Sequence, residues 1–227
     1  MTTQEKNRIR YGGREYAVIG VRGVSLPTPD DYGVYPDAWH DGCYAGFIST
    51  YLVQGVQLYL DAFHIGQLID PNGWKPINGV KPVAVRQPAY AGSGRGRGNI
   101  PAGRQYCGLD VPVAFSGELL IARDYIPELH VPDRANGKPY QYREIHELWF
   151  VYGELVVATD RSGMGAKWRA KITKRRQQKR QKLTELKAEG LTQEEIAQQY
   201  RAWVKVTFPA QRDPLAWNFI RDYDEWY

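Results

Sequence analysis

The sequence is poor in cysteine, and the two that occur, Cys43 and Cys107, belong to no C-x-x-C pair. Structural zinc sites and dithiol redox centres depend on closely spaced ligands of that kind. We therefore expect no metal and no cofactor. The scarcity of cysteine also fits a reducing compartment, so that a cytoplasmic protein is expected.

Long apolar runs are absent as well. No stretch approaches the roughly 18 apolar residues of a membrane-spanning helix, and the polar segment 1–10 lacks the apolar run of a signal peptide. A protein that is neither exported nor embedded in a membrane is predicted. Aromatic residues nevertheless make up 13% and hydrophobic residues 43% of the chain, enough apolar surface for a compact body.

Diagnostic catalytic motifs are missing too. The chain has no H-x-x-x-H, no G-x-S-x-G and no phosphate-binding G-K-[ST] motif. Some histidines still allow an enzymatic function. Glu144 and His146 share one strand face, and two further pairs are His40 with Asp41 and Asp61 with His64. These pairs could converge for acid–base chemistry or metal binding. Cys43 beside His40 is more typical of simple packing than of a nucleophile.

Strand patterns fill the first two thirds of the sequence. Residues 15–64 are rich in aromatic and β-branched types, with a hairpin over 47–60 that turns at Gly55. A second hairpin of the same form is predicted over 145–158, and a single strand over 115–121. Between them, residues 65–110 hold 14 Gly or Pro in 46 positions, which predicts a long loop.

Helix patterns begin after Gly165. Residues 166–188 contain no Gly or Pro, a capping box at Thr192 and Glu195 starts a helix over 192–206, and Asp213 before Pro214 starts one over 214–226. The predicted organisation is a β-rich body over 1–163 and a helical extension over 164–227. The predicted class is α+β, with an antiparallel sheet or partly open barrel built from two hairpin-based halves.

Two strand motifs carry a resemblance. The segment from Gly46 and Phe47 to Leu60, and the segment from Ala114 to Leu119, resemble those of an uncharacterised family of small bacterial β-rich proteins with no assigned function. The resemblance covers roughly residues 15–160 and excludes the helical extension. It implies a bacterial or phage setting and a two-part β body, and it brings no catalytic residue with it.

Positive charge is concentrated in one segment. Residues 167–187 hold ten Lys or Arg against one acid, a charge of +9, so the rest of the chain carries 5 − 9 = −4. A helix with such a charged middle must face solvent or a polyanion, and its like charges four residues apart repel one another. The predicted phosphate contacts are Lys171, Lys174, Arg175, Arg176, Lys179, Arg180 and Lys182.

Two further surfaces complete the predicted sites. Arg95 and Arg97 lie in a Gly-rich stretch, 92–98, that could follow a phosphate backbone, although a plain connector is the simpler interpretation. The aromatic side chains of the last helix form either a core face or a protein-docking anchor. Those side chains are Trp217, Phe219, Tyr223 and Trp226.

The sequence therefore favours a non-enzymatic bacterial or phage accessory protein. Its basic helix would contact RNA or DNA, and its β body and aromatic tail would contact other proteins. Two alternatives stay open: an adaptor, inhibitor or immunity-type protein that binds only an acidic protein partner, and a metal or acid–base enzyme that acts on a nucleotide.

Overall fold

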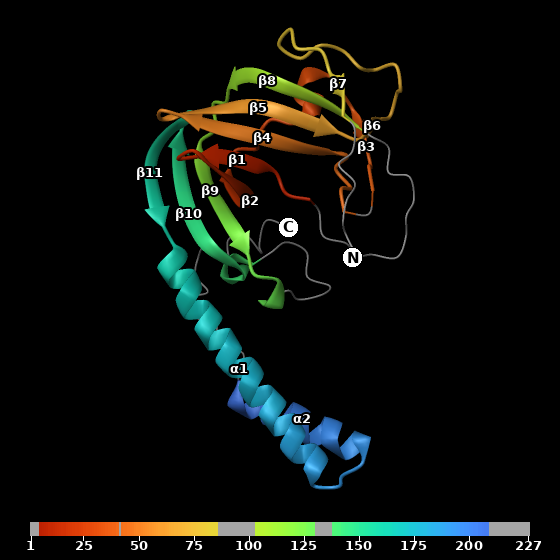
Figure 1. The fold of residues 1–227 in the computed structure, drawn as a ribbon, viewed down its shortest axis with the longest axis vertical. Coiled ribbons are helices and arrows are strands. Elements are labelled where there is room, and N and C mark those ends of the chain that lie inside the picture. The colour runs from red at the N-terminus through yellow and green to blue at the C-terminus, as the bar shows by residue number, and fades with distance from the viewer. Residues whose placement is uncertain (1–4, 41, 86–102, 130–137, 209–227) are drawn as a thin grey trace. The chain divides into compact units, whose positions relative to one another are not determined.

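A computed structural model describes residues 5–40, 42–85, 103–129 and 138–208. The chain divides into two units, residues 1–162 and residues 163–227. The first unit is built of strands and short 3-10 helices, and the second contains two described α-helices, so the fold is α+β (Figure 1).

The strands of the described body lie in two sheets. They are β1 (Arg8–Tyr11), β2 (Arg14–Gly23), β3 (Pro36–Asp37), β4 (Phe47–Gln54), β5 (Gln57–Ile65), β6 (Gln67–Leu68), β7 (Val83–Ala84), β8 (Arg104–Pro112), β9 (Gly117–Tyr125), β10 (Tyr142–Val151) and β11 (Glu154–Asp160). Three 3-10 helices connect them: η1 (Pro29–Tyr32), η2 (Pro127–Leu129) and η3 (Pro139–Gln141). The main sheet has nine strands in the order β11-β10-β9-β2-β1-β4-β5-β8-β7, and β3 pairs with β6 separately.

Both predicted hairpins are present, as β4 with β5 and as β10 with β11. The main sheet is mostly antiparallel, but β1 runs parallel to β4, and this pair joins the two halves of the sheet. The sheet therefore has one parallel junction that hairpin patterns alone do not predict.

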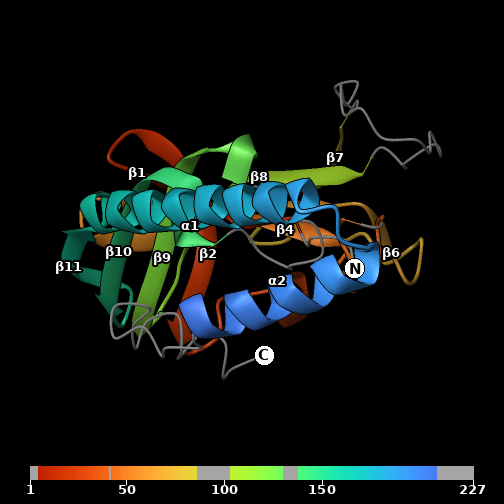
Figure 2. The ribbon, with the colours of Figure 1, turned by 90° about the horizontal axis from the view of Figure 1, so that it is seen from below.

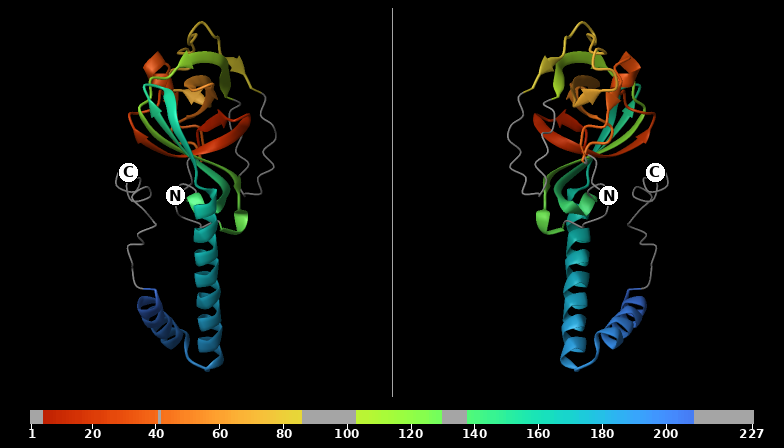
Figure 3. Two further views of the ribbon diagram at one scale, coloured as in Figure 1. Left: turned by 90° about the vertical axis from the view of Figure 1, so that its left-hand side faces the viewer. Right: turned by 90° about the vertical axis from the view of Figure 1, so that its right-hand side faces the viewer.

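The turns of the two hairpins meet and partly close the sheet into a ring. Leu58 donates its N–H to the carbonyl of Gly153 at 2.9 Å, and Leu155 donates to the carbonyl of Val56 at 2.6 Å. Gly153 has a φ of +87°, and a Cβ there would lie 2.1 Å from the carbonyl oxygen of Val113, so only glycine fits this contact. The ring is a partly open barrel, and β7 and β8 extend beyond it (Figures 1 and 3).

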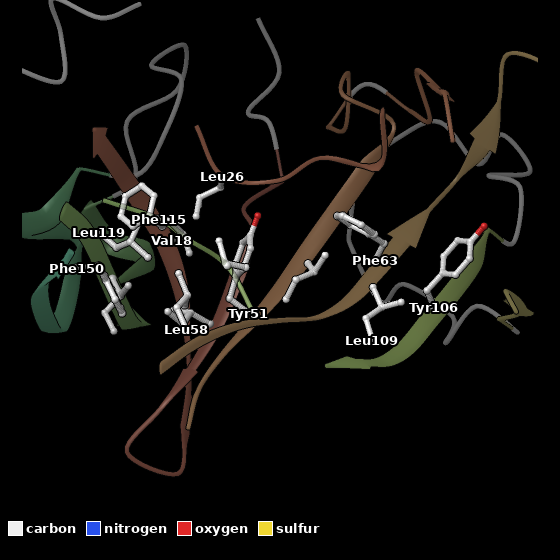
Figure 4. Close-up of a cluster of buried hydrophobic side chains, with 14 of the residues drawn as sticks. Val18, Leu26, Tyr51, Leu58, Phe63, Tyr106, Leu109, Phe115, Leu119 and Phe150 are labelled. Atoms are coloured by element: carbon white, nitrogen blue, oxygen red, sulfur yellow. The ribbon is translucent and has the colours of Figure 1, made fainter. Parts of the chain in front are cut away.

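The core fills the concave side of this curved sheet (Figure 4). Alternate residues of each strand point inward, as a two-residue period requires. Tyr51, Phe63 and Phe115 are among the largest side chains that are fully buried, and Phe115 packs edge-on against Phe150 at 6.0 Å between ring centroids.

The prediction that residues 65–110 form a long loop was wrong for its last part. Strand β8 pairs with β5. Its residues Tyr106 and Leu109 are buried, with 0% and 1% of their surface exposed. Gly108 and Asp110 both have positive φ, 69° and 49°, so the strand is irregular and lacks a clean alternating pattern. The high Gly and Pro content of residues 65–110 therefore predicted a loop where the chain forms a well-packed strand.

The strand pattern also begins earlier than Glu15. Strand β1 precedes a turn at Gly12 and Gly13, and it places Ile9 and Tyr11 on the core side while its arginines point away. With Ile9 buried and Tyr11 half-buried among basic neighbours, β1 lies between β2 and β4 in the sheet and pairs with both.

The second unit contains α1 (Ser162–Ala188) and α2 (Gln193–Thr207) among its described residues. The predicted helix over 214–226 lies outside the described residues. Neither described helix has the length and apolar character to cross a membrane.

Candidate nucleic-acid interface

Helix α1 forms because its residues favour the helical backbone. After Gly165 it consists largely of Lys, Arg, Gln, Leu and Ala, which have high helix propensity. At about 1.5 Å per residue, its 27 residues extend about 40 Å. The helix gives way to a turn at Gly190, which has a φ of 71°.

Helix α2 begins with the predicted capping box. The backbone N–H of Glu195 donates to the hydroxyl of Thr192 at 3.4 Å, and the Glu195 carboxylate accepts from the backbone N–H of Thr192 at 2.9 Å. The Thr192 hydroxyl also donates to the Glu195 carboxylate at 2.7 Å, and this bond, followed by the one from the Thr192 backbone N–H, lowers the pKa of Glu195 below its ordinary value. The cap starts α2 directly after the turn, so that α2 runs back along α1 (Figure 2).

One side of α1 is occupied by contacts inside this helical unit. Leu186 is 1% exposed, and beyond the end of α2 the ring of Phe208 lies against two basic side chains. The Arg175 guanidinium is 5.7 Å and the Lys179 ammonium 5.4 Å from the centre of that ring, within the range of a cation–π contact. Arg175 and Lys179 therefore point toward α2, which the charge pattern did not predict.

The predicted phosphate contacts in α1 differ in exposure. Lys171, Lys174 and Arg180 are exposed, and Arg175, Arg176, Lys179 and Lys182 are half-buried. The predicted contacts Arg95 and Arg97, and the aromatic side chains Trp217, Phe219, Tyr223 and Trp226, lie outside the described residues.

Six of the basic side chains that do not lie against Phe208 form two rows along α1, and Lys182 and Lys187 belong to neither row. One row, the lysine row, consists of Lys167, Lys171 and Lys174. The other, the arginine row, consists of Arg169, Arg176 and Arg180. Members of a row are separated by three, four or seven residues, spacings that return to the same side of an α-helix.

The rows are not screened by acids of the same stretch. Residues 167–182 include nine basic residues and no acidic one, and the first acid, Glu185, forms an ion pair with Lys182 at 3.8 Å. Two basic rows concentrate positive potential along residues 167–180 of the helix, which attracts polyanions.

No protein-family model matches this chain, and neither a curated protein nor a solved structure is similar enough to count as a match. The resemblance to a bacterial β-rich family therefore stays a prediction. What the chain can do has to be inferred from its own residues.

In the body, the most polar cluster surrounds Glu144. Its Oε1 atom accepts a hydrogen bond from the Tyr16 hydroxyl at 2.6 Å and lies 3.1 Å from Nε2 of His146. Arg123 Nε is 2.9 Å from the Oε2 atom, and Arg14 Nη1 is 3.4 Å from Oε1. The predicted shared face of Glu144 and His146 is confirmed by this contact.

The Glu144 cluster continues the core face of the sheet. Two-residue alternation places Glu144 and His146 on the side of Leu148 in β10, and places Arg123 on the side of Ile121 in β9. Four strands, β1, β2, β9 and β10, thus contribute to one polar end of the barrel interior, and the rings of Tyr11 and Tyr16 lie edge-on to His146.

The electrostatics of this cluster favour a structural role. The Tyr16 hydrogen bond is the main cause that lowers the pKa of Glu144, so the carboxylate stays ionised. Burial, together with the Glu144 carboxylate, raises the pKa of Tyr16 to about 12, so the phenol keeps its proton. A general acid or base needs a pKa near the working pH, and neither group has one.

The other two histidines of the predicted set, His40 and His64, lie beside one tryptophan. The rings of His40 and His64 both contact Trp39, at 5.3 and 4.5 Å between centroids, and Nε2 of His40 lies 3.3 Å from Glu5. Asp61 instead forms an ion pair with Arg10 at 2.5 Å. No group of three or more His, Cys, Asp or Glu residues in the described part of the chain is placed to hold a metal ion. Asp41 lies outside the described residues.

Sequence reasoning did not single out Lys6. Its Nζ atom is buried and has no hydrogen-bond partner among the described residues. Burial alone lowers the pKa of this amine to about 8. In the sequence Lys6 resembles any solvated charge, and only the folded structure shows that its Nζ atom is buried.

An apolar patch lies on the outer face of the second hairpin. Trp149 and Val157 are cross-strand neighbours that are 45% and 44% exposed, and Val156 beside them is 53% exposed. Exposed apolar side chains that gather in this way are typical of protein-binding surfaces. The patch was not predicted, because a strand with one buried and one exposed aromatic residue has the same sequence pattern as an ordinary edge strand.

Proposed function

We propose that this protein is a non-enzymatic accessory protein of a bacterium or phage that contacts nucleic acid through α1. The observation that carries the proposal is the pair of basic rows on a helix of 27 residues, in a stretch with no acid from 167 to 182. A phosphate backbone supplies the repeated negative charge that such rows can neutralise, and the release of its counterions favours binding.

The division of charge supports the same proposal. Residues 1–162 hold 16 basic and 17 acidic residues, a net charge of 16 − 17 = −1, so the body has no excess of positive charge that would attract a polyanion. Contact with nucleic acid is therefore expected to be local to α1, and a protein partner is expected at the apolar patch around Trp149.

The test is to measure the affinity of the full chain for nucleic acid as a function of salt. If five phosphate contacts form, log K falls with log salt with a slope of about −3.5 to −4.5. Replacement of the lysine row, Lys167, Lys171 and Lys174, by Gln should make this slope shallower by about 2 to 3. The control replaces three exposed bases elsewhere, Lys81, Arg143 and Lys205, and removes the same charge.

Equal loss of affinity in both variants would show that only net charge matters and would contradict a site on α1. A wild-type chain that binds no nucleic acid, but captures an acidic protein from a nuclease-treated lysate, would favour the adaptor alternative instead.

A further inference from the structure

The side of α1 that faces away from α2 carries a neutral stripe between the two basic rows. It consists of Ala170, Thr173, Gln177, Gln181 and Thr184, which recur every three or four residues and are all exposed. At roughly 100° per residue, these positions share one side of the helix. The lysine row borders the neutral stripe on one flank and the arginine row on the other.

From this arrangement we infer that α1 lies in the major groove of B-form duplex DNA, with its neutral stripe against the base edges. This inference rests on the proposed nucleic-acid contact and names its substrate. A helix with its side chains is about 10–12 Å across, and the major groove of B-DNA is about 12 Å wide. The two basic rows then lie near the phosphates of the two strands.

The chemistry of the neutral stripe fits base contacts better than phosphate contacts. A Gln amide can pair with N6 and N7 of adenine, and Ala or the Thr methyl group can pack against the methyl group of thymine. In the structure, Gln181 donates to Glu185 at 3.0 Å, and the Thr184 hydroxyl donates to the carbonyl of Arg180 at 3.0 Å. Gln177, at the centre of the neutral stripe, is therefore the main candidate for base recognition, and it favours A·T pairs.

The geometry argues against two other occupants. The major groove of A-form RNA is too deep and narrow for side chains to reach the bases. A second copy of α1 packed on the neutral stripe would bring basic rows of the two helices together, which like-charge repulsion disfavours.

From Ala170 to Thr184 the neutral stripe extends about 21 Å, at about 1.5 Å per residue. That length corresponds to about six base pairs at about 3.4 Å each. A straight helix leaves the curved groove within such a distance, so we expect a recognised site of about four to six base pairs.

The experiment selects from a pool of randomised duplex DNA with the full chain at fixed salt, and then compares two variants. Gln177→Ala removes the proposed base contact, whereas Gln178→Ala makes the same change one residue away, on the lysine-row side. The wild type and Gln178→Ala should enrich one A·T-containing site over random duplex. Gln177→Ala should lose about 5- to 150-fold of that discrimination while keeping its affinity for random duplex.

Three results would overturn the inference. Equal discrimination between the selected site and random duplex by the two variants would show that Gln177 does not recognise bases. Binding of duplex RNA as tight as that of duplex DNA would show that α1 does not bind in the major groove. A dimer in solution that Gln177→Ala dissociates would assign the neutral stripe to a second copy. In each of these cases the salt-dependent binding of the wild type would still support the proposed function, whose own failure would appear as a loss of all nucleic-acid binding.

Discussion

Two neighbouring residues of β10 should differ sharply in their effect on stability. Phe150 is 0% exposed and packs in the core, whereas Trp149 is 45% exposed on the outer face. Alternation along the strand requires this difference. We expect Phe150→Ala to destabilise the body strongly and Trp149→Ala to destabilise it much less.

The magnitude follows from burial and from the cavity that each change leaves. Replacing a fully buried Phe by Ala costs about 3–5 kcal/mol, because the lost contacts add to the energy of the cavity. For a unit of this size, about 2–4 °C is lost per kcal/mol, so the melting temperature should fall by about 6–20 °C. Trp149→Ala opens no closed cavity, because its outer face is already in solvent, and should cost about 1–2 kcal/mol.

The assay is denaturant unfolding of the full chain followed by circular dichroism of the β body, with the transition slope compared between variants. An unchanged slope assigns the shift in midpoint to stability. If Trp149→Ala lowers the midpoint as much as Phe150→Ala does, the inward and outward faces of β10 are assigned wrongly. The register between β9 and β10 would then be wrong as well.

Two further predictions concern the body as a unit and its polar end. Glu144→Gln should remove part of the acid sensitivity of the protein. Folding lowers the pKa of Glu144 from an ordinary value of 4.5, so its stabilising effect is present above that value and is lost as pH falls through the folded pKa. Urea midpoints at pH 7 and pH 4 would contradict this if both proteins lost stability equally. Residues 1–162, expressed alone, should unfold cooperatively and no longer bind nucleic acid, and an aggregated fragment would show that the second unit is needed for folding.

Strand positions with strong local signals could be predicted from the sequence. The hairpins around Gly55 and Gly153 combine β-branched and aromatic runs with a residue that accepts positive φ, and both formed. Strand β8 escaped prediction because its pairing with β5 compensates for two left-handed residues, a gain that no local pattern contains. The parallel pairing of β1 with β4 is likewise a long-range choice of the fold.

The polar cluster shows the same limit at the level of side chains. Sequence pattern related Glu144 to His146, because they are two residues apart on one strand. It could not relate them to Tyr16, which is 128 residues away from Glu144 in sequence, or to Arg123 on a different strand. On α1, local pattern located the charge, but the contact of Arg175 and Lys179 with Phe208 depends on how α2 folds back.

The distribution of ion pairs explains why α1 is the surface on which a polyanion is expected. Several described arginines of the body lie beside carboxylates that balance their charge, as in Arg10 with Asp61 and Arg161 with Glu147, both at 2.5 Å. Residues 167–182 of α1 include nine basic residues and no acidic one, and each like-charged pair four residues apart, such as Arg176 with Arg180, costs a few tenths of a kcal/mol. A phosphate backbone along the two rows would neutralise these charges and relieve their repulsion. On the body, a phosphate would first have to displace the carboxylates that already pair with the arginines.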